Sequence, residues 1–311
     1  MEMRQAYAQE MAKLMRDDRH VIVLDADLAN STAMRKLYSE FPDQMFECGI
    51  AEQSMCSIAA GLSSYGFRPY IETFAPFASR RICDQVAISV AYAKQNVKIV
   101  GTDGGIGAEL NGGTHMSVED IGVLRSIPEI VIFEPCDEIQ LRAAIPVIHE
   151  YEGPLYLRLY RKELSIIHHE GYRFSLFQAD LLKSGSDLSV FVSGIPVSDT
   201  LEAAKDLEKE GISCEVIDVH TIKPVDRETV IASAQKTGAV LTVENHNVIG
   251  GLHSAILETL AQEGIPCWSV GIRDRFGEVG NLSYLKEALG LTKEDIKNGM
   301  RQAAGKRIRR G

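Results

Sequence analysis

The sequence has no long apolar run and no paired cysteine motif. No stretch approaches the roughly 18 consecutive apolar residues of a membrane-spanning helix, and the N-terminal residues show no apolar run typical of a signal peptide. The 6 cysteines are dispersed without a C-x-x-C pair, which fits reduced thiols better than a disulfide framework or a cysteine zinc site. These absences predict a cytoplasmic protein without a membrane segment.

Basic residues are also scarce relative to acidic ones. The chain has 33 basic and 43 acidic residues, a net charge of −10, and no long basic stripe, which argues against broad nucleic-acid binding. Its 311 residues, 45% of them hydrophobic, are enough for about two domains with sizeable cores.

Short apolar runs alternate with segments of helical periodicity along most of the chain. We predict helices over 4–17, from 51 onward, over 138–149 and over 203–211. Predicted strands cover 21–25, 46–50, 67–74, 97–100, 130–134, 154–159, 188–194, 214–219, 239–244 and 268–272. Such alternation is typical of mostly parallel sheets. We therefore expect an α/β protein of two three-layer α/β/α domains, 1–167 and 188–311, joined by a polar linker over 168–187.

Glu52 lies where a predicted strand end becomes a helix start. The segment 46–55 is partly apolar and contains Gly49 just before the helix. An acidic residue in a first helical turn is often explained by the unsatisfied N–H groups there. The apolar, glycine-flanked surroundings favour a second interpretation, in which Glu52 enters a partly dry site and shares a proton.

The Ile-Ala-Glu-Gln segment around Glu52, with several later segments, resembles the transketolase family of thiamine diphosphate enzymes. The resemblance implies that Glu52 hydrogen-bonds the cofactor's aminopyrimidine ring and is catalytic. The Thr-Phe-x-x-Phe match implies that Phe74 and Phe77 form an aromatic wall against that ring, with Phe77 stacking on it. Asp27 and Arg80 are further expected contacts of the cofactor.

A glycine-rich loop, 101–115, follows the strand at 97–100 and lacks the Gly-Lys-Ser/Thr ending of a phosphate-binding P-loop. By the resemblance, His115 contacts the sugar substrate and takes part in catalysis. Asp103 stands where the family usually has a substrate-contacting His, and Asn111 where it usually has an Asp. An acidic residue would repel a phosphate, so we expect an unusual donor or acceptor sugar.

Three residues match the family's phosphate-binding positions. Arg4, Ser31 and Arg161 correspond to the Arg, Ser and Arg that bind a sugar phosphate. Two guanidinium groups and a hydroxyl are suitable for anion recognition. These matches favour a small sugar or sugar phosphate as substrate.

The metal-binding Gly-Asp-Gly segment of full-length transketolases is missing, and we predict no metal site in this chain. The segments 221–226 and 243–246, with Gly250 and Gly251, also resemble the family's C-terminal domain. Because the resemblance starts at the pyrimidine-binding domain and lacks the metal-binding segment, it implies the C-terminal subunit of a split transketolase. A companion N-terminal subunit is then expected to hold the diphosphate and Mg²⁺, giving a heterotetramer in which this chain forms a homodimer.

Three alternatives stay open from the sequence. The chain is also compatible with a deoxyxylulose-phosphate synthase-like protein, with a 2-oxo acid dehydrogenase β-type subunit, or with a non-catalytic assembly subunit. The Ile-Ala-Glu-Gln and Thr-Ile-Lys-Pro segments favour transketolase over the first two. The combined presence of Glu52, Phe74, Phe77 and His115 argues against the third.

Overall fold

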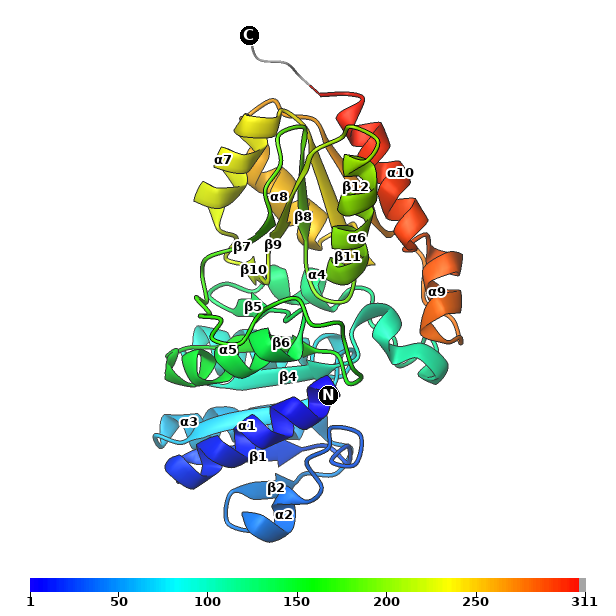
Figure 1. The fold of residues 1–311 in the computed structure, drawn as a ribbon. Helices are drawn as coiled ribbons and strands as arrows, with labels where there is room; N and C mark the ends of the chain where they lie inside the picture. The colour runs from blue at the N-terminus through cyan, green and yellow to red at the C-terminus, as the bar shows by residue number, and fades with distance from the viewer. Residues whose placement is uncertain (308–311) are drawn as a thin grey trace.

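The computed structural model describes residues 1–307, arranged around two β-sheets (Figure 1). The first sheet has seven strands in the order β10-β5-β6-β4-β3-β1-β2. Its strands are β1 (Val21–Asp25), β2 (Met45–Glu47), β3 (Arg68–Phe74), β4 (Lys98–Thr102), β5 (Val131–Phe133), β6 (Leu155–Leu159) and β10 (Thr221–Lys223). All neighbouring strands are parallel except β10, which runs antiparallel to β5.

Both faces of the first sheet are buried. Along β1, Val21 and Val23 pack on one side and Ile22 and Leu24 on the other, in separate apolar clusters. This explains why the strands read as nearly continuous apolar runs. The helices of this half are α1 (Met3–Asp17), α2 (Leu37–Glu40), α3 (Glu52–Ser64), η1 (Arg80–Ile82), the π-helix η2 (Gln85–Tyr92), η3 (Gly105–Asn111), α4 (Asp120–Arg125) and α5 (Glu138–Glu150).

The second sheet has five strands in the order β12-β11-β8-β9-β7, with β7 antiparallel to β9 and the rest parallel. They are β7 (Asp180–Lys183), β8 (Leu188–Val192), β9 (Cys214–Asp218), β11 (Val240–Asn247) and β12 (Cys267–Ile272). The helices are α6 (Val197–Glu208), α7 (Arg227–Thr237), α8 (Leu252–Leu260), α9 (Leu282–Leu289) and α10 (Lys293–Ala304). Apolar clusters lie on both faces, with α6 and α10 on one and α7 and α8 on the other.

The predicted fold class is confirmed, since both halves are three-layered with mostly parallel sheets. Two strands were not predicted, and both modify the expected organisation. The segment 168–187, predicted to be an irregular linker, contains β7, which joins the second sheet. β10 leaves the second half and pairs with β5 of the first sheet. The exact domain boundaries stay a prediction.

Two expectations about the whole chain can be compared with the structure. All 6 cysteines are free thiols. Among the described residues, the helices are too short or too polar to cross a membrane.

Candidate active site

Glu52 is the first residue of α3, and a sharp turn places it there. Gly49 has a φ of 68°, and its carbonyl accepts a hydrogen bond from Ala51 N, after which the helix begins. The Glu52 side chain is buried, with only 3% of the residue exposed, and its Oε1 lies 2.5 Å from Nη1 of Arg81. The carboxylate therefore sits in a mostly dry environment with one cationic partner.

Three rings converge beside Glu52. Phe74 ends β3, Phe77 lies in the following turn, and His115 comes from the loop after β4. The His115 ring makes edge contacts with Phe74 and Phe77 at centroid distances of 5.8 and 5.3 Å, and the two Phe rings are 6.2 Å apart. The structure thus brings together an aromatic wall from two segments that the sequence separates by about forty residues.

Arg81 occupies the space between this wall and Glu52. Its guanidinium carbon lies 3.7 Å from the centroid of the Phe77 ring, while Nη1 donates to Glu52. A flat, cationic N–H donor is therefore stacked on Phe77 and paired with a buried carboxylate. A protonated aminopyrimidine is likewise flat, cationic and an N–H donor, so the positions of Glu52 and Phe77 are compatible with such a ring.

A group of charged residues adjoins the aromatic wall. Arg161 lies over Phe74, with the guanidinium carbon 5.1 Å from the ring centroid, and forms an ion pair with Asp103. Arg4 Nη1 donates to the Ser31 carbonyl at 3.0 Å, and Arg4 N donates to the Arg161 carbonyl at 3.2 Å. The predicted anion-binding residues are thus neighbours. Burial raises the pKa of Asp103 to about 6, although Arg161 opposes the shift.

The remaining predicted site residues lie around this centre. Asp27 is exposed with a φ of 60°, and its backbone N–H donates to Glu47 at 2.9 Å. Arg80 donates to the Thr114 carbonyl of the glycine-rich loop at 3.4 Å and pairs with Glu119, just after that loop. Asn111 ends η3 with an exposed side chain. Their roles stay predictions.

The second half of the chain holds the glycine-rich loop in place. Asn245, on β11, accepts from Ile106 N at 2.8 Å and donates to the Gly104 carbonyl at 3.0 Å. Gly105 between them has a φ of 59°, and a Cβ there would lie 2.2 Å from the Asn245 side chain. Only glycine combines this backbone angle with so close an approach. The C-terminal half therefore shapes the loop that carries Asp103 and His115.

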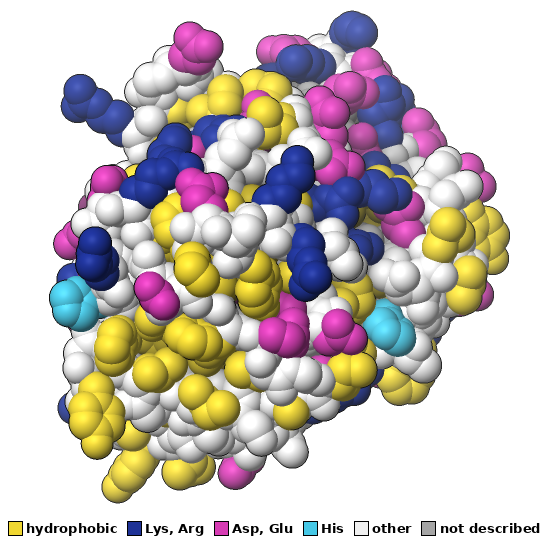
Figure 2. All heavy atoms as spheres, turned by 90° about the horizontal axis from the view of Figure 1, so that it is seen from below, with side chains coloured by type: hydrophobic (Ala, Val, Ile, Leu, Met, Phe, Trp, Pro, Cys, Tyr) yellow, Lys and Arg dark blue, Asp and Glu magenta, His cyan; other side chains and the backbone are white. Residues whose placement is uncertain are grey.

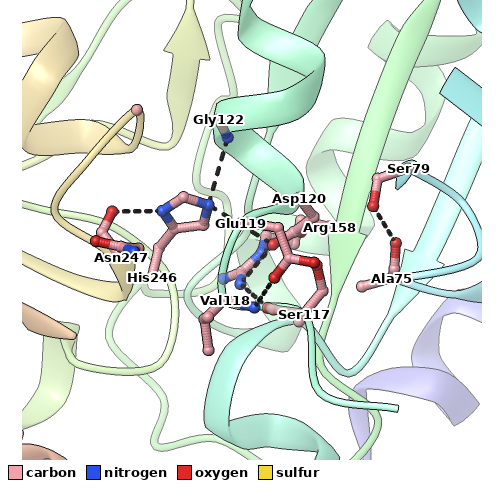
Figure 3. Close-up of polar contacts among 12 residues, drawn as sticks. Ala75, Ser79, Ser117, Val118, Glu119, Asp120, Gly122, Arg158, His246 and Asn247 are labelled. Carbon is pink, nitrogen blue, oxygen red and sulfur yellow. Dashed lines mark hydrogen bonds and ion pairs between the residues drawn. The ribbon is translucent and has the colours of Figure 1, made fainter. Parts of the chain in front are cut away.

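Arg158 is the centre of a buried polar network behind that loop (Figure 3). It contacts Asp120 with two nitrogens, at 2.7 and 3.1 Å, contacts Glu134 at 2.5 Å, and donates to the Asn245 carbonyl at 3.0 Å. Burial opposes the charge of Asp120, but the attraction of Arg158 outweighs it and lowers the pKa of Asp120. His246 accepts from Gly122 N at 3.3 Å, which ties α4 to β11.

A row of three carboxyl groups lies under the loop that carries Asp27 and Ser31. Glu47, Asp25 and Glu72 occupy matching positions on β2, β1 and β3. Burial and the neighbouring Glu47 raise the pKa of Asp25 to about 7, and burial with the charge of Asp25 raises the pKa of Glu72 to about 8. Asp25 Oδ1 accepts from the backbone N–H groups of Leu28 and Ala29, at 2.7 and 3.0 Å. The row thus supports this part of the site.

Comparison with known proteins gives the family. The sequence matches the transketolase pyrimidine-binding domain over residues 1–166 and the transketolase C-terminal domain over residues 178–296. The chain belongs to the transketolase family. The enzymes of this family depend on thiamine diphosphate, in agreement with the fit of Glu52 and Phe77.

Several relatives of this transketolase-family chain are subunits. This chain is 47% identical to the 6-deoxy-6-sulfo-D-fructose transketolase subunit SqwH of Clostridium sp. (strain MSTE9), and the aligned region covers 94% of this chain and 92% of that one. It is 34% identical to an apulose-4-phosphate transketolase subunit of Phocaeicola vulgatus, covering 94% of both. A solved structure described as a split gene transketolase, inactive beta4 tetramer, matches with a TM-score of 0.90 and 39% identity over 99% of both chains.

Three residues of the site were missed in the sequence. Arg81 adjoins the predicted Arg80, and nothing in the local pattern shows which of the two faces Glu52. Arg158 lies inside an apolar strand, where a single charged residue is a signal for a buried ion pair. Asn245 lies in a segment interpreted only as part of the family's C-terminal domain, and its contact with the loop spans 139 residues.

Proposed function

We propose that the chain is the C-terminal subunit of a two-chain, thiamine diphosphate-dependent transketolase. The observation that carries this proposal is the placement of Arg81, which bridges the buried Glu52 and the face of Phe77. When bound, the cofactor supplies the nucleophilic carbon that takes up a two-carbon unit from a ketose for transfer to an aldose.

Each side chain of the centre has a distinct task in this proposal. Glu52 holds a proton at the ring nitrogen of the aminopyrimidine, in a dry environment that strengthens the contact. Phe77 supports the flat face of the ring, and Phe74 backs the wall. His115, at the edge of that wall and 2.9 Å from the Thr114 hydroxyl, contacts the sugar and assists proton transfer.

The substrates we propose carry an anionic end. Arg161 and Arg4 provide positive charge, but Asp103 pairs with Arg161 and Glu2 pairs with Arg4 at 2.9 Å. A sulfonate carries one negative charge, whereas a phosphate monoester carries about 1.5 to 2 at pH 7. The reduced positive charge favours the sulfonate, in agreement with the sulfofructose named for one relative.

Assembly with other subunits is the third part of the proposal. A companion N-terminal subunit supplies the diphosphate and Mg²⁺ sites in a cytoplasmic heterotetramer, and this chain pairs with a second copy. The helices α3 and η2 pack together and expose large apolar side chains, namely Ile58, Ile88 and Tyr92. The view from below shows hydrophobic side chains gathered toward its lower left (Figure 2). Such exposure is typical of an interaction surface.

The decisive experiment is a ketol-transfer assay with thiamine diphosphate and Mg²⁺. We expect little activity from the chain alone, full activity after the companion subunit is added, and loss of about 10²- to 10⁴-fold in Glu52→Ala. Glu150→Ala, at an exposed carboxylate, is the matched control and should stay active. Full activity of Glu52→Ala in a complete mixture would refute the assigned role. Inactivity of the wild-type mixture on every sugar tried would favour the non-catalytic assembly subunit.

A second assay tests the substrate class. We expect kcat/KM to be higher for 6-deoxy-6-sulfofructose than for fructose 6-phosphate, and Asp103→Asn to shift the ratio toward the phosphate, because it removes a negative charge beside Arg161. Asp84→Asn, at an exposed carboxylate, should leave the ratio unchanged. A wild-type preference for the phosphate, with no shift in Asp103→Asn, would contradict the charge argument while leaving the transketolase activity established.

A further inference from the structure

Glu109, in the middle of the glycine-rich loop, has a backbone conformation that is unusual for a residue with a Cβ. Its φ is 46° and its ψ is −118°, inside η3. Glycine adopts such angles readily, whereas other residues adopt them at a cost in free energy and mostly at functional sites. The roles proposed for Glu52, Phe77 and His115 leave Glu109 without a task. Its strain persists only where the contacts of its side chain offset that cost.

The Glu109 side chain is buried against the residues that follow β6. Only 7% of the residue is exposed. Its Oε1 accepts from the Tyr160 hydroxyl at 3.0 Å, and its Oε2 accepts from Lys162 Nζ at 2.7 Å. The Lys162 side chain is 57% exposed, so that ion pair contributes little, whereas the hydrogen bond from Tyr160 is buried. Tyr160 is therefore the main partner that fixes Glu109.

The end of β6 and the residues after it also hold the start of the loop. Asp103 N donates to the Leu159 carbonyl at 2.9 Å, and Asp103 Oδ1 accepts from Arg161 N at 3.2 Å. The loop is thus attached to this part of the chain at two points, of which Glu109 is the second. Within 107–113, Glu109 is the one residue whose side chain hydrogen-bonds to another segment among those that the structure describes.

The backbone of Glu109 leads directly to the part of the loop that carries Asn111 and His115. The Glu109 carbonyl accepts from Gly112 N at 3.1 Å, and the Gly112 carbonyl accepts from His115 N at 3.0 Å. These two hydrogen bonds set the path of the chain from Glu109 to His115, and Asn111 lies on that path. A displacement of Glu109 therefore also displaces the two residues assigned to the sugar.

We propose that Glu109 is a positioning residue, whose side chain anchors the strained loop to Tyr160 and so places Asn111 and His115 for the sugar substrate. The anchor is a property of the chain by itself, while its effect on the sugar rests on the proposed transketolase function. Glu109 acts through the loop and not on the cofactor. Loss of the anchor should therefore weaken the use of the sugar without weakening the binding of thiamine diphosphate.

Hydrogen exchange of the full-length chain tests the anchor without an activity assay. The amide hydrogens of 110–116 should exchange about tenfold faster in Glu109→Ala and in Tyr160→Phe than in wild type, because the buried hydrogen bond is lost. Tyr172→Phe removes a hydroxyl–carboxylate hydrogen bond outside the loop, so it is the matched control and should exchange like wild type over 110–116. Wild-type exchange in both Glu109→Ala and Tyr160→Phe would overturn the proposal.

Melting temperatures test the strain. Glu109→Gly and Glu109→Ala lose the same side-chain contacts, but only glycine adopts the backbone angles at this position without strain. We expect Glu109→Gly to melt above Glu109→Ala. Lys205, exposed in α6, gives the matched control, because alanine should melt above glycine at an ordinary helix position. A Glu109→Ala variant that melts above Glu109→Gly would contradict the proposal.

Kinetics of the reconstituted enzyme test the effect on the sugar. In Glu109→Ala and Tyr160→Phe, kcat/KM for the sugar should fall about 10- to 100-fold, and the KM for thiamine diphosphate should stay unchanged. Glu109→Gln retains an oxygen for the Tyr160 hydroxyl, and Lys162→Met removes only the exposed ion pair, so both should keep most of the wild-type value.

The outcomes separate this inference from the proposed function. Unchanged kcat/KM in Glu109→Ala, within an active enzyme, would overturn the positioning role. Losses in Glu109→Gln and Lys162→Met as large as in Glu109→Ala would assign the effect to charge and overturn the anchor. An inactive wild-type mixture would refute the proposed function instead, and hydrogen exchange would then decide whether the anchor exists.

Discussion

Replacement of Arg158 by Met should destabilise the chain strongly, because two buried carboxylates would lose their shared counter-ion. Asp120 would retain the Tyr156 hydroxyl at 2.8 Å and Glu134 the Ser193 hydroxyl at 2.8 Å, but neither partner is charged. Removing one partner of a buried ion pair typically costs about 3–5 kcal/mol. At about 2 °C per kcal/mol for a chain of this size, the melting temperature should fall by roughly 6–10 °C.

Differential scanning calorimetry of the wild-type chain and Arg158→Met at pH 7 measures this loss. Arg301→Met is the control, because Arg301 makes its ion pairs with Glu210 and Glu294 in solvent and should contribute little. Arg158→Lys keeps the positive charge but loses the planar guanidinium group that binds Asp120 with two nitrogens. Its melting temperature should therefore lie between those of wild type and Arg158→Met. A melting temperature of Arg158→Met within about 2 °C of wild type would refute the reasoning.

The pH dependence of the same measurement has a definite sign. The pKa of Asp120 is lowered in the folded chain, so its contribution to stability is present above the unfolded pKa of about 4 and is lost as the pH falls through the lowered value. In the wild-type chain this contribution should therefore be complete at pH 7 and decrease only in acid. In Arg158→Met, burial without Arg158 should raise the pKa of Asp120, so the variant gains a proton and the difference between the two melting temperatures should decrease as the pH falls from 8. A difference that stays constant down to about pH 4 would contradict this.

Three further substitutions test other parts of the structure. Phe77→Ala should raise the apparent KM for thiamine diphosphate about tenfold in the reconstituted enzyme, and Phe276→Ala, at an exposed ring, should not; equal values would remove Phe77 from the cofactor site. Glu72→Gln should flatten the decline of melting temperature from pH 6 to pH 9. A carboxyl group with a raised pKa stabilises the fold below its unfolded pKa, and this contribution is lost as the pH rises through the folded pKa of about 8. Parallel curves of melting temperature against pH for wild type and Glu72→Gln would contradict this. Asn245→Ala leaves the buried Ile106 N–H unpaired, so it should cost about 1–3 kcal/mol in urea unfolding and raise KM for the sugar; an unchanged KM would show that the loop needs no support.

The sequence predicted the features that depend on local pattern. The strand at 21–25 and the helix from 138 were predicted almost to the residue. Both depend on neighbouring residues: the strand on its apolar run, and the helix on its apolar periodicity and on Asp137 at its N-cap. The position of Glu52 at the start of a helix was confirmed for the same reason.

The features that were missed depend on pairing between distant segments. The alignment of Asp25 with Glu47 and Glu72 follows from strand register, which no single strand reveals. The short strand β7 lies at a sheet edge and is partly exposed, so it shows no apolar run. The choice of Arg81 over Arg80 as the partner of Glu52 is set by the turn after β3, whose geometry is determined only in three dimensions.

The antiparallel pairing of β10 with β5 affects how this protein can be divided or recombined. A fragment that ends at residue 167 lacks β10, so β5 becomes an open edge with unpaired N–H and C=O groups. Such a fragment is prone to add a strand from another molecule. Chimeras between relatives that join their halves within 168–187 inherit the same difficulty, because residues 221–223 of one parent must then complete the sheet of the other. A workable chimera therefore has to take β10 from the same parent as the first half, although β10 is encoded within the second half.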